Sequence, residues 1–203
     1  MSLANYTEMA AAVESWLNRV GHSDVADNVA DFIAFGQRTI HYTTDLKAME
    51  DLQTLTVNAQ SVALPADFLR VKTLIGAEGS GTWEILGAPH RDVMDYGRAG
   101  RPNTYDIIGS NFWFGPPPDQ EYTAQLIYYK ALPILSETNT TNWFTDNYPE
   151  LLLTAAVVEA LYFLKDDARA QVWEKKYQQH KIAILQSEAR SDREGGGMRV
   201  RLK

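Results

Sequence analysis

A nearly continuous apolar run from Leu151 to Leu164 limits what this chain can fold into. The run is 14 residues long by position and contains Thr154 and Glu159. A membrane-spanning helix needs about 20 apolar residues, so we interpret the run as a core helix. Pro149 precedes it and suits the first turn of a helix, where its missing N–H is not needed. A helix that is apolar almost all round should be buried on several sides.

Two helices are predicted near the N-terminus. Asn5 is a candidate N-cap of the first helix, with Glu8 as its reciprocal acidic partner. Gly21 is expected to end this helix. Ser23 is a candidate cap for the second, in which Gly36 should allow close packing against the first helix. The apolar stripes are Met9, Ala12, Val13, Trp16, Leu17 and Val20 in the first, and Val25, Val29, Phe32, Ile33 and Ile40 in the second.

From about Leu52 the apolar period changes from helical spacing to two. Strands are predicted around Leu55 and Val57, around Val62 and Leu64, and over Val71–Ile75, Thr82–Leu86, Tyr105–Ile108, Phe112–Phe114 and Tyr122–Tyr129. Turns are predicted over Gly76–Gly81 and Gly109–Asn111, and a short helix over Asp92–Tyr96. This region therefore reads as antiparallel β-structure.

The last part of the chain returns to helical spacing. Asn147 is a candidate cap for the core helix, and Asp166 with Asp167 should end it and begin another. The final helix is expected to bury Ala170, Trp173, Tyr177 and Ile184 and to extend to about Arg190.

The order of these elements predicts an α+β fold. A helical bundle is expected from residues 1–50 and 142–192, and an inserted β-rich domain from residues 51–141. A flexible, extended C-terminal tail is expected over residues 193–203.

Composition limits the chemistry. The chain has no Cys and a net charge of −7, which excludes thiol catalysis and Cys-based zinc sites and argues against tight binding to phosphates. The N-terminus lacks the pattern of a signal peptide. The four His residues of the chain are not spaced as metal ligands, and the sequence contains no G-x-S-x-G nucleophile elbow. We expect no cofactor, metal or catalytic residue.

Two other features carry weaker functional signals. The aromatic residues of the β region, among them Trp83, Trp113 and Tyr122, could stack on sugars or bases, but aromatics at period two more often form a core or an interface. The terminal residues are Gly195, Gly196, Gly197, Met198, Arg199, Val200, Arg201, Leu202 and Lys203. This alternation of apolar and basic residues is compatible with disorder or with strand addition to a partner.

Three segments and the first helix together resemble the head–tail adaptor (connector) proteins of short-tailed phages. The first segment is Leu64–Leu69, with the sequence LPADFL. The second contains Gly100–Pro102, Tyr105, Gly109, Pro116–Pro118 and Leu126–Tyr129. The third contains Thr141–Trp143, Pro149–Leu151, Asp166–Arg169 and Trp173. In the first helix the matching residues are Val13, Trp16 and Leu17.

The resemblance implies a structural virion protein without enzymatic activity. It implies a ring, usually of twelve copies, at the head–tail junction between the portal protein and the tail nozzle protein, assembled in the host cytoplasm and without a membrane. DNA would pass through it without specific binding. By this resemblance, Gly195–Lys203 would bind the portal, while Trp83, Trp113 and Tyr122 are candidates for the nozzle or subunit interface.

Two alternatives remain open at this point. A tail-associated carbohydrate-binding or hydrolytic protein would use the aromatic and acidic residues. A nucleic-acid-binding protein would need a strong salt-dependent affinity for DNA, which the acidic balance disfavours.

Overall fold

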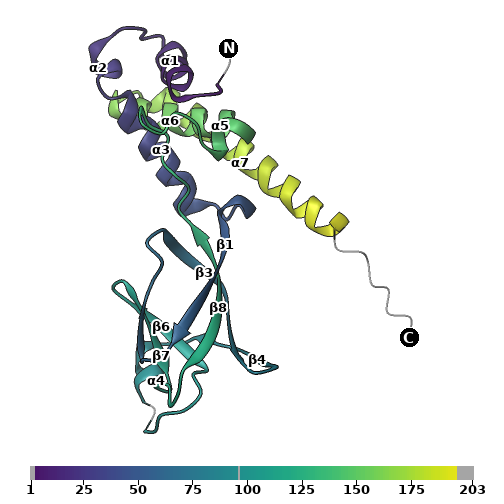
Figure 1. The fold of residues 1–203 in the computed structure, drawn as a ribbon. Helices are drawn as coiled ribbons and strands as arrows, with labels where there is room; N and C mark the ends of the chain where they lie inside the picture. Colours follow the sequence, from purple (N-terminus) through teal and green to yellow (C-terminus); the bar gives the residue numbers. More distant parts are fainter. Residues whose placement is uncertain (1–2, 96, 196–203) are drawn as a thin grey trace. The chain divides into compact units, whose positions relative to one another are not determined.

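The computed structural model describes residues 3–95 and 97–195, and the side chains among them up to residue 190 (Figure 1). The chain forms two compact units. One combines the residues up to Ala48 with those from Leu132 onward, and the other is the continuous segment Met49–Ala131. The first unit is helical and the second is rich in antiparallel strands, which confirms the predicted α+β fold class.

The helical unit is built around α6. Its elements are α1 (Tyr6–Leu17), α2 (Ser23–Ala26), α3 (Val29–Thr43), α5 (Trp143–Asn147), α6 (Pro149–Phe163) and α7 (Asp167–Gly195), and the short 3-10 helix η1 (Lys47–Met49) leads out of it. Helices α1, α3, α5 and α7 all pack against α6 (Figure 1). Every residue of α6 from Leu151 to Val158 is buried, so the expected burial on several sides is confirmed.

The cap of α1 is the predicted one. The side chain of Asn5 accepts a hydrogen bond of 3.0 Å from the backbone N–H of Glu8, whose carboxylate accepts one of 2.8 Å from Ala4. The predicted end at Gly21 is wrong. The helix ends at Leu17 because Asn18 adopts the left-handed conformation, with a φ of 57°, a role that Asn can take as well as Gly.

The prediction of one continuous helix beginning at Ser23 is also wrong. Two helices, α2 and α3, are separated at Asn28, and neither has a side-chain cap. The side chain of Asn28 bonds to the carbonyl of Asp24, which favours a turn over a continuous helix. The apolar stripe is nevertheless correct, since the following residues are all buried: Val25, Val29, Phe32, Ile33 and Ile40.

Gly36 packs closely, as predicted, but against a different helix. A β-carbon on Gly36 would lie 2.7 Å from the backbone nitrogen of Ala156 and 2.9 Å from the carbonyl carbon of Ala155. The partner is therefore α6, not α1. The sequence could not distinguish the two because α6 lies more than 100 residues further along the chain.

Pro149 occupies the first turn of α6, as predicted, but Asn147 does not cap the helix. The cap in this region is Asn142, at the start of α5. Its side chain accepts from the backbone N–H groups of Phe144 and Thr145, and its own backbone N–H donates to the Thr145 hydroxyl. A short helix thus precedes α6 and ends where Pro149 begins the next.

Helix α7 begins after Lys165, which adopts a φ of 57°. The carboxylate of Asp166 accepts from the backbone N–H of Arg169, so this acidic residue helps to start the helix. Ala170, Tyr177 and Ile184 are buried as predicted. The helix runs to Gly195 and is longer than expected.

The β unit contains two four-stranded sheets. One has the order β1 (Glu50–Val57), β8 (Tyr122–Lys130), β3 (Phe68–Glu78) and β4 (Gly81–Glu84), and the other β2 (Ser61–Ala63), β7 (Asn111–Gly115), β6 (Thr104–Ile108) and β5 (Leu86–Gly87). All pairings among these strands are antiparallel except β5 with β6. A short helix, α4 (His90–Met94), begins two residues before the predicted one.

Both sheets contribute to one core. Its buried members are Leu55, Val57, Leu74, Ile85, Phe112, Phe114, Tyr122, Ala124, Leu126 and Tyr128. The predicted hairpin with its turn at Gly109 is confirmed by the pairing of Ile108 with Asn111. The turn predicted over Gly76–Gly81 is shorter, because β3 continues to Glu78.

The segment Leu64–Leu69 leads from β2 into the first residues of β3. The Asp67 side chain accepts a hydrogen bond of 2.9 Å from the Tyr128 hydroxyl, and its carbonyl accepts one of 2.7 Å from Ala131. The Phe68 ring stacks on Tyr128, with centroids 5.9 Å apart. Burial and this carboxylate raise the pKa of Tyr128 to about 12. The segment that carries the family resemblance therefore has a structural role.

Candidate interaction surfaces

Trp83 is held in a fixed position at the edge of the β unit. Its indole N–H donates a hydrogen bond of 2.6 Å to the carbonyl of Pro102, and the Arg101 guanidinium lies 4.8 Å from the ring centroid. The ring lies over Gly76, where a β-carbon would clash with it. Trp83 thus forms part of a fixed and partly exposed surface that carries one cationic group.

The ring of Tyr122 packs against the ring of Trp83. The two rings meet edge to face, with centroids 5.7 Å apart at 85°. Tyr122 is only 6% exposed, and its hydroxyl donates a hydrogen bond of 2.7 Å to Asp119. This bond is the main reason that the pKa of Tyr122 is raised. The structure therefore brings these two predicted interface residues together, with Trp83 as the more accessible one.

Trp113 belongs to the other sheet. It lies on β7 between Phe112 and Phe114, which are both fully buried. Alternate residues of a strand point to opposite faces, so Trp113 is on the outer face of that sheet. Its neighbours across the ladder are Asp106 and Ser61. The three aromatic residues thus belong to two separate surfaces.

The predicted portal-binding tail begins at the end of α7. Gly195 is the last residue of that helix. The remaining residues of the tail, Gly196, Gly197, Met198, Arg199, Val200, Arg201, Leu202 and Lys203, lie outside the part of the chain that the structure describes.

A tryptophan pair joins α1 to α7. Trp16 and Trp173 meet edge to face, with centroids 5.2 Å apart, and the Lys176 ammonium lies 4.8 and 4.7 Å from the two rings. The Arg169 guanidinium also donates to the carbonyl of Trp16. Trp16 is 46% exposed. The helical stripes placed both tryptophans on apolar faces, but only the packing of α1 against α7 shows that they form one partly exposed cluster.

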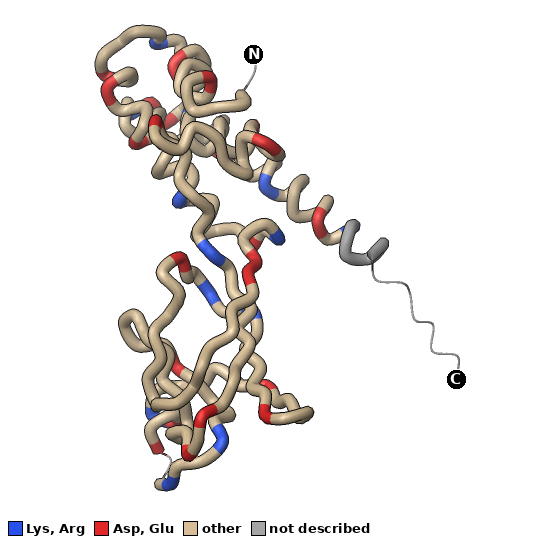
Figure 2. The backbone as a smooth tube through the Cα atoms, viewed as in Figure 1, with Lys and Arg blue, Asp and Glu red and all other residues tan. Residues whose placement is uncertain are grey.

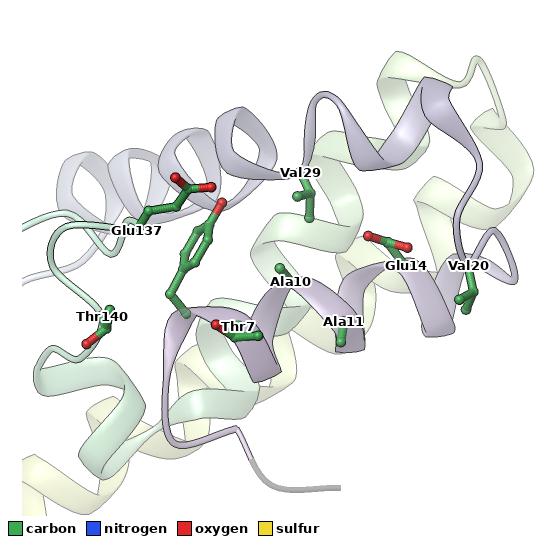
Figure 3. Close-up of a pocket in the computed structure, with 9 residues that line it drawn as sticks. Thr7, Ala10, Ala11, Glu14, Val20, Val29, Glu137 and Thr140 are labelled. Carbon is green, nitrogen blue, oxygen red and sulfur yellow. The ribbon is translucent and has the colours of Figure 1, made fainter.

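A groove of about 500 Å³ runs along α1 in the helical unit (Figure 3). In Figure 3 Ala10 and Ala11 lie between Glu137 at one end and Glu14 and Val20 at the other. The full lining is Tyr6, Thr7, Ala10, Ala11, Glu14, Val20, Val29, Glu137 and Thr140. No local sequence pattern predicts this groove, since its lining comes from α1, from Val20 and Val29 further along the chain, and from the segment before α5.

The groove has an acidic character. Tyr6 is buried in its wall, and this burial, together with the nearby carboxylates of Glu137 and Asp31, raises the pKa of its hydroxyl. Residues 6–43 carry five acidic and two basic side chains, and Figure 2 shows acidic positions outnumbering basic ones over α1–α3. Residues 167–190 of α7, in contrast, carry five basic and three acidic side chains.

The described residues contain no group of three or more His, Asp or Glu side chains that could hold a metal ion. Among the helices in the described ranges, none is long and apolar enough to cross a membrane. The groove, the Trp83 surface and the exposed faces of the helices are therefore the features that we consider for function.

In a comparison with known protein families, residues 4–201 match the family described as SU10 adaptor protein. No protein with a curated description matches the sequence significantly. The family match includes both structural units and almost the entire chain. The chain therefore belongs to the SU10 adaptor family of phage head–tail adaptor proteins.

Proposed function

We propose that this protein forms a ring of twelve copies that joins the portal protein to the tail nozzle protein and lets DNA pass through its centre. The observation that carries the proposal is the family match over residues 4–201. The family indicates a structural adaptor role in the virion, at the head–tail junction. The ring, its copy number and its two partners are the proposed part.

The charge of the chain supports passage of DNA rather than its capture. The net charge is −7, and proteins that bind DNA without sequence preference neutralise phosphates with clustered Lys and Arg. An acidic body would repel the duplex and keep it from adhering to the channel. No enzymatic step is part of the proposal.

The tail Gly195–Lys203 is the proposed contact with the portal. Its basic and apolar residues alternate and directly follow α7. Such a segment can add a strand to a partner sheet, with its side chains alternating into pockets. The Trp83 surface with Tyr122, and Trp113 on the other sheet, are the proposed contacts with the nozzle or with neighbouring subunits.

The portal contact is tested by deleting Gly195–Lys203. The truncated chain should keep the thermal stability of the parent and lose binding to the portal protein of the same phage in a pull-down experiment. Portal binding that is unchanged after the deletion would show that the tail is not the contact.

The ring is tested by electron microscopy of the full chain with that portal protein. We expect a closed ring stacked on the portal. A monomer that never associates with the portal would contradict the adaptor proposal, and cleavage or binding of glycans by the isolated monomer would support the carbohydrate-active alternative.

A further inference from the structure

The exposed side of α7 is an apolar and basic surface that none of the described residues of the helical unit covers. Its buried side, with Ala170, Tyr177 and Ile184, faces the bundle. On the opposite side Val172 and Ile182 are 66% and 52% exposed. These two residues, with Ala168, Lys175, Gln179 and Gln186, follow each other at spacings of four and three and are all exposed. We call these six residues the outer face of α7.

Spacings of four and three place side chains along one side of a helix, the arrangement with which helices pack against other helices. An exposed Val or Ile alone needs no explanation. Here both belong to one stripe with Lys175 and Gln179 between them, and the stripe extends over about five turns of the helix. The outer face is thus suited to a second helical surface of acidic character.

The groove along α1 has the matching properties. Ala10 and Ala11 form its floor, and their small side chains let another helix approach closely. Val20 and Val29 add apolar surface, and Val20 is 71% exposed. Glu137 is exposed at one end of the groove. The volume of about 500 Å³ is sufficient for several side chains of a docked helix.

We propose that the outer face of α7 of one copy docks in the α1 groove of a second copy of this chain, so that Val172 and Ile182 contact its apolar residues and Lys175 approaches a carboxylate at one end of the groove, Glu14 or Glu137. This inference rests on the proposed ring and names the two faces that build it.

A second copy is the fitting occupant for two reasons. The two surfaces carry opposite charge, and complementary charges across an interface favour the correct pairing. In addition, the surfaces differ from each other and belong to different elements of one unit. A contact between two different faces is heterologous, the type of contact that generates a ring when the rotation between copies closes. An isologous contact would instead stop at a dimer.

The absence of Cys from the chain allows a direct test by engineered cross-linking. The double variant Ala11→Cys/Gln179→Cys places one thiol in the groove and one at the centre of the outer face. The matched control is Ala11→Cys/Gln178→Cys. Gln178 is also exposed, but its side chain points about 100° away around the helix. Both variants are assembled as full chains with the portal protein of the same phage and then oxidised.

We expect the Gln179 pair to give a ladder of covalent dimers, trimers and larger species on a non-reducing gel. The yield should be about tenfold above that of the Gln178 pair, because disulfides form only when the two Cα atoms come within about 7 Å. A cross-link within one chain would give no ladder. The single variants should remain monomeric on the gel, and the Tm of both double variants should equal that of the parent.

The outcomes separate this inference from the adaptor proposal. Closed rings in micrographs of the Gln179 pair without a ladder would overturn the named faces while the ring proposal stands. Dimers formed by the single variants would show an isologous contact and would likewise overturn them. The absence of both rings and ladder would contradict the two proposals together.

Discussion

At the scale of single residues, two glycines show how little space separates the elements of this protein. Gly36 lies against the backbone of α6, and Gly76 lies beneath the indole ring of Trp83. In both cases the neighbour is fixed, by a helix backbone or by the hydrogen bond from Trp83 to Pro102. A β-carbon at either position would need a displacement of that neighbour.

We expect Gly36→Ala to destabilise the protein by about 1 to 3 kcal/mol, as overpacking of a core does. The sign is informative, because Ala in place of Gly within a helix would otherwise stabilise by about 1 kcal/mol. Urea denaturation measures the change. Gly97→Ala is the control, since a β-carbon at Gly97 would have no heavy atom within 4 Å; its free energy of unfolding should change by less than about 0.5 kcal/mol. A stabilising Gly36→Ala would contradict the close contact.

Tyr128 should make the stability of the protein depend on alkaline pH. Its pKa is raised to about 12 in the folded state, from an ordinary value of 10.0. The hydroxyl therefore ionises more readily in the unfolded chain, and stability that is complete below pH 10 is lost as the pH rises toward 12. Tyr128→Phe should lower stability at pH 8 and reduce its decline over that range.

The measurement for this prediction is urea denaturation at a series of pH values from 8 to about 11.5. Tyr42→Phe is the matched control: Tyr42 is 69% exposed, so this substitution should leave the free energy of unfolding at pH 8 unchanged. The same alkaline decline in Tyr128→Phe as in the parent would show that other tyrosines are responsible. Tyr105 and Tyr177, whose pKa values burial also raises, are the next candidates.

At the scale of elements, α7 has two sides with different roles. One side packs against α6, and its Tyr177 ring reaches the Thr43 hydroxyl at the end of α3. The other side is exposed and is the proposed subunit contact. Stability and assembly should therefore respond to different residues of the same helix.

Ile184→Ala and Ile182→Ala separate these two roles. Ile184 is 7% exposed and Ile182 is 52% exposed. Removing the buried side chain should cost about 2 to 5 kcal/mol, from lost burial and the cavity that is left. Removing the exposed one should cost less than about 0.5 kcal/mol. Thermal unfolding measures both. Only Ile182→Ala should weaken association between copies while leaving Tm unchanged, and equal losses of stability would contradict the assignment of the two sides.

At the scale of the whole molecule, the chain leaves the helical unit once and returns to it once. The β unit, Met49–Ala131, begins and ends at neighbouring positions, because Glu50 of β1 pairs with Tyr129 of β8. It also has its own core, to which both of its sheets contribute. A segment with paired ends and a separate core meets the conditions for independent folding.

We therefore expect the isolated segment Met49–Ala131 to fold without the rest of the chain. Circular dichroism should show β-structure, and thermal unfolding should be a single cooperative transition. Leu126→Ala in the isolated segment, at a fully buried position of its core, should lower the Tm. A segment without a cooperative transition would show that the helical unit is needed for its stability.

The alternation of helical and strand periods was sufficient to predict the fold class, most elements and most of the core. Met9, Ile33 and Leu126 lie on the predicted faces and are fully buried. The boundaries were less predictable, because they depend on single backbone conformations. Asn18 ends α1 by adopting a left-handed conformation, and Asn28 divides the second helix. Asn also occurs within helices, so the local sequence does not decide between the two outcomes.

The sequence indicates a candidate interaction surface only where one continuous segment carries the signal. The alternating tail is such a segment, although most of it lies beyond the described residues. Trp83 and Tyr122 were predicted individually, but their contact depends on the pairing of β3 with β4 and β8. The groove along α1 and the cluster of Trp16 with Trp173 had no counterpart in the sequence.

The apolar central helix, the flanking amphipathic helices and the antiparallel β region could all be predicted from the amino-acid sequence, because these features depend on the spacing of side chains along a short segment. The packing of the folded chain, in contrast, sets which helix lies against Gly36, which side of α7 stays exposed, and where the groove opens. Each of these depends on residues that are far apart in the chain and meet only after folding, so no local pattern can record them.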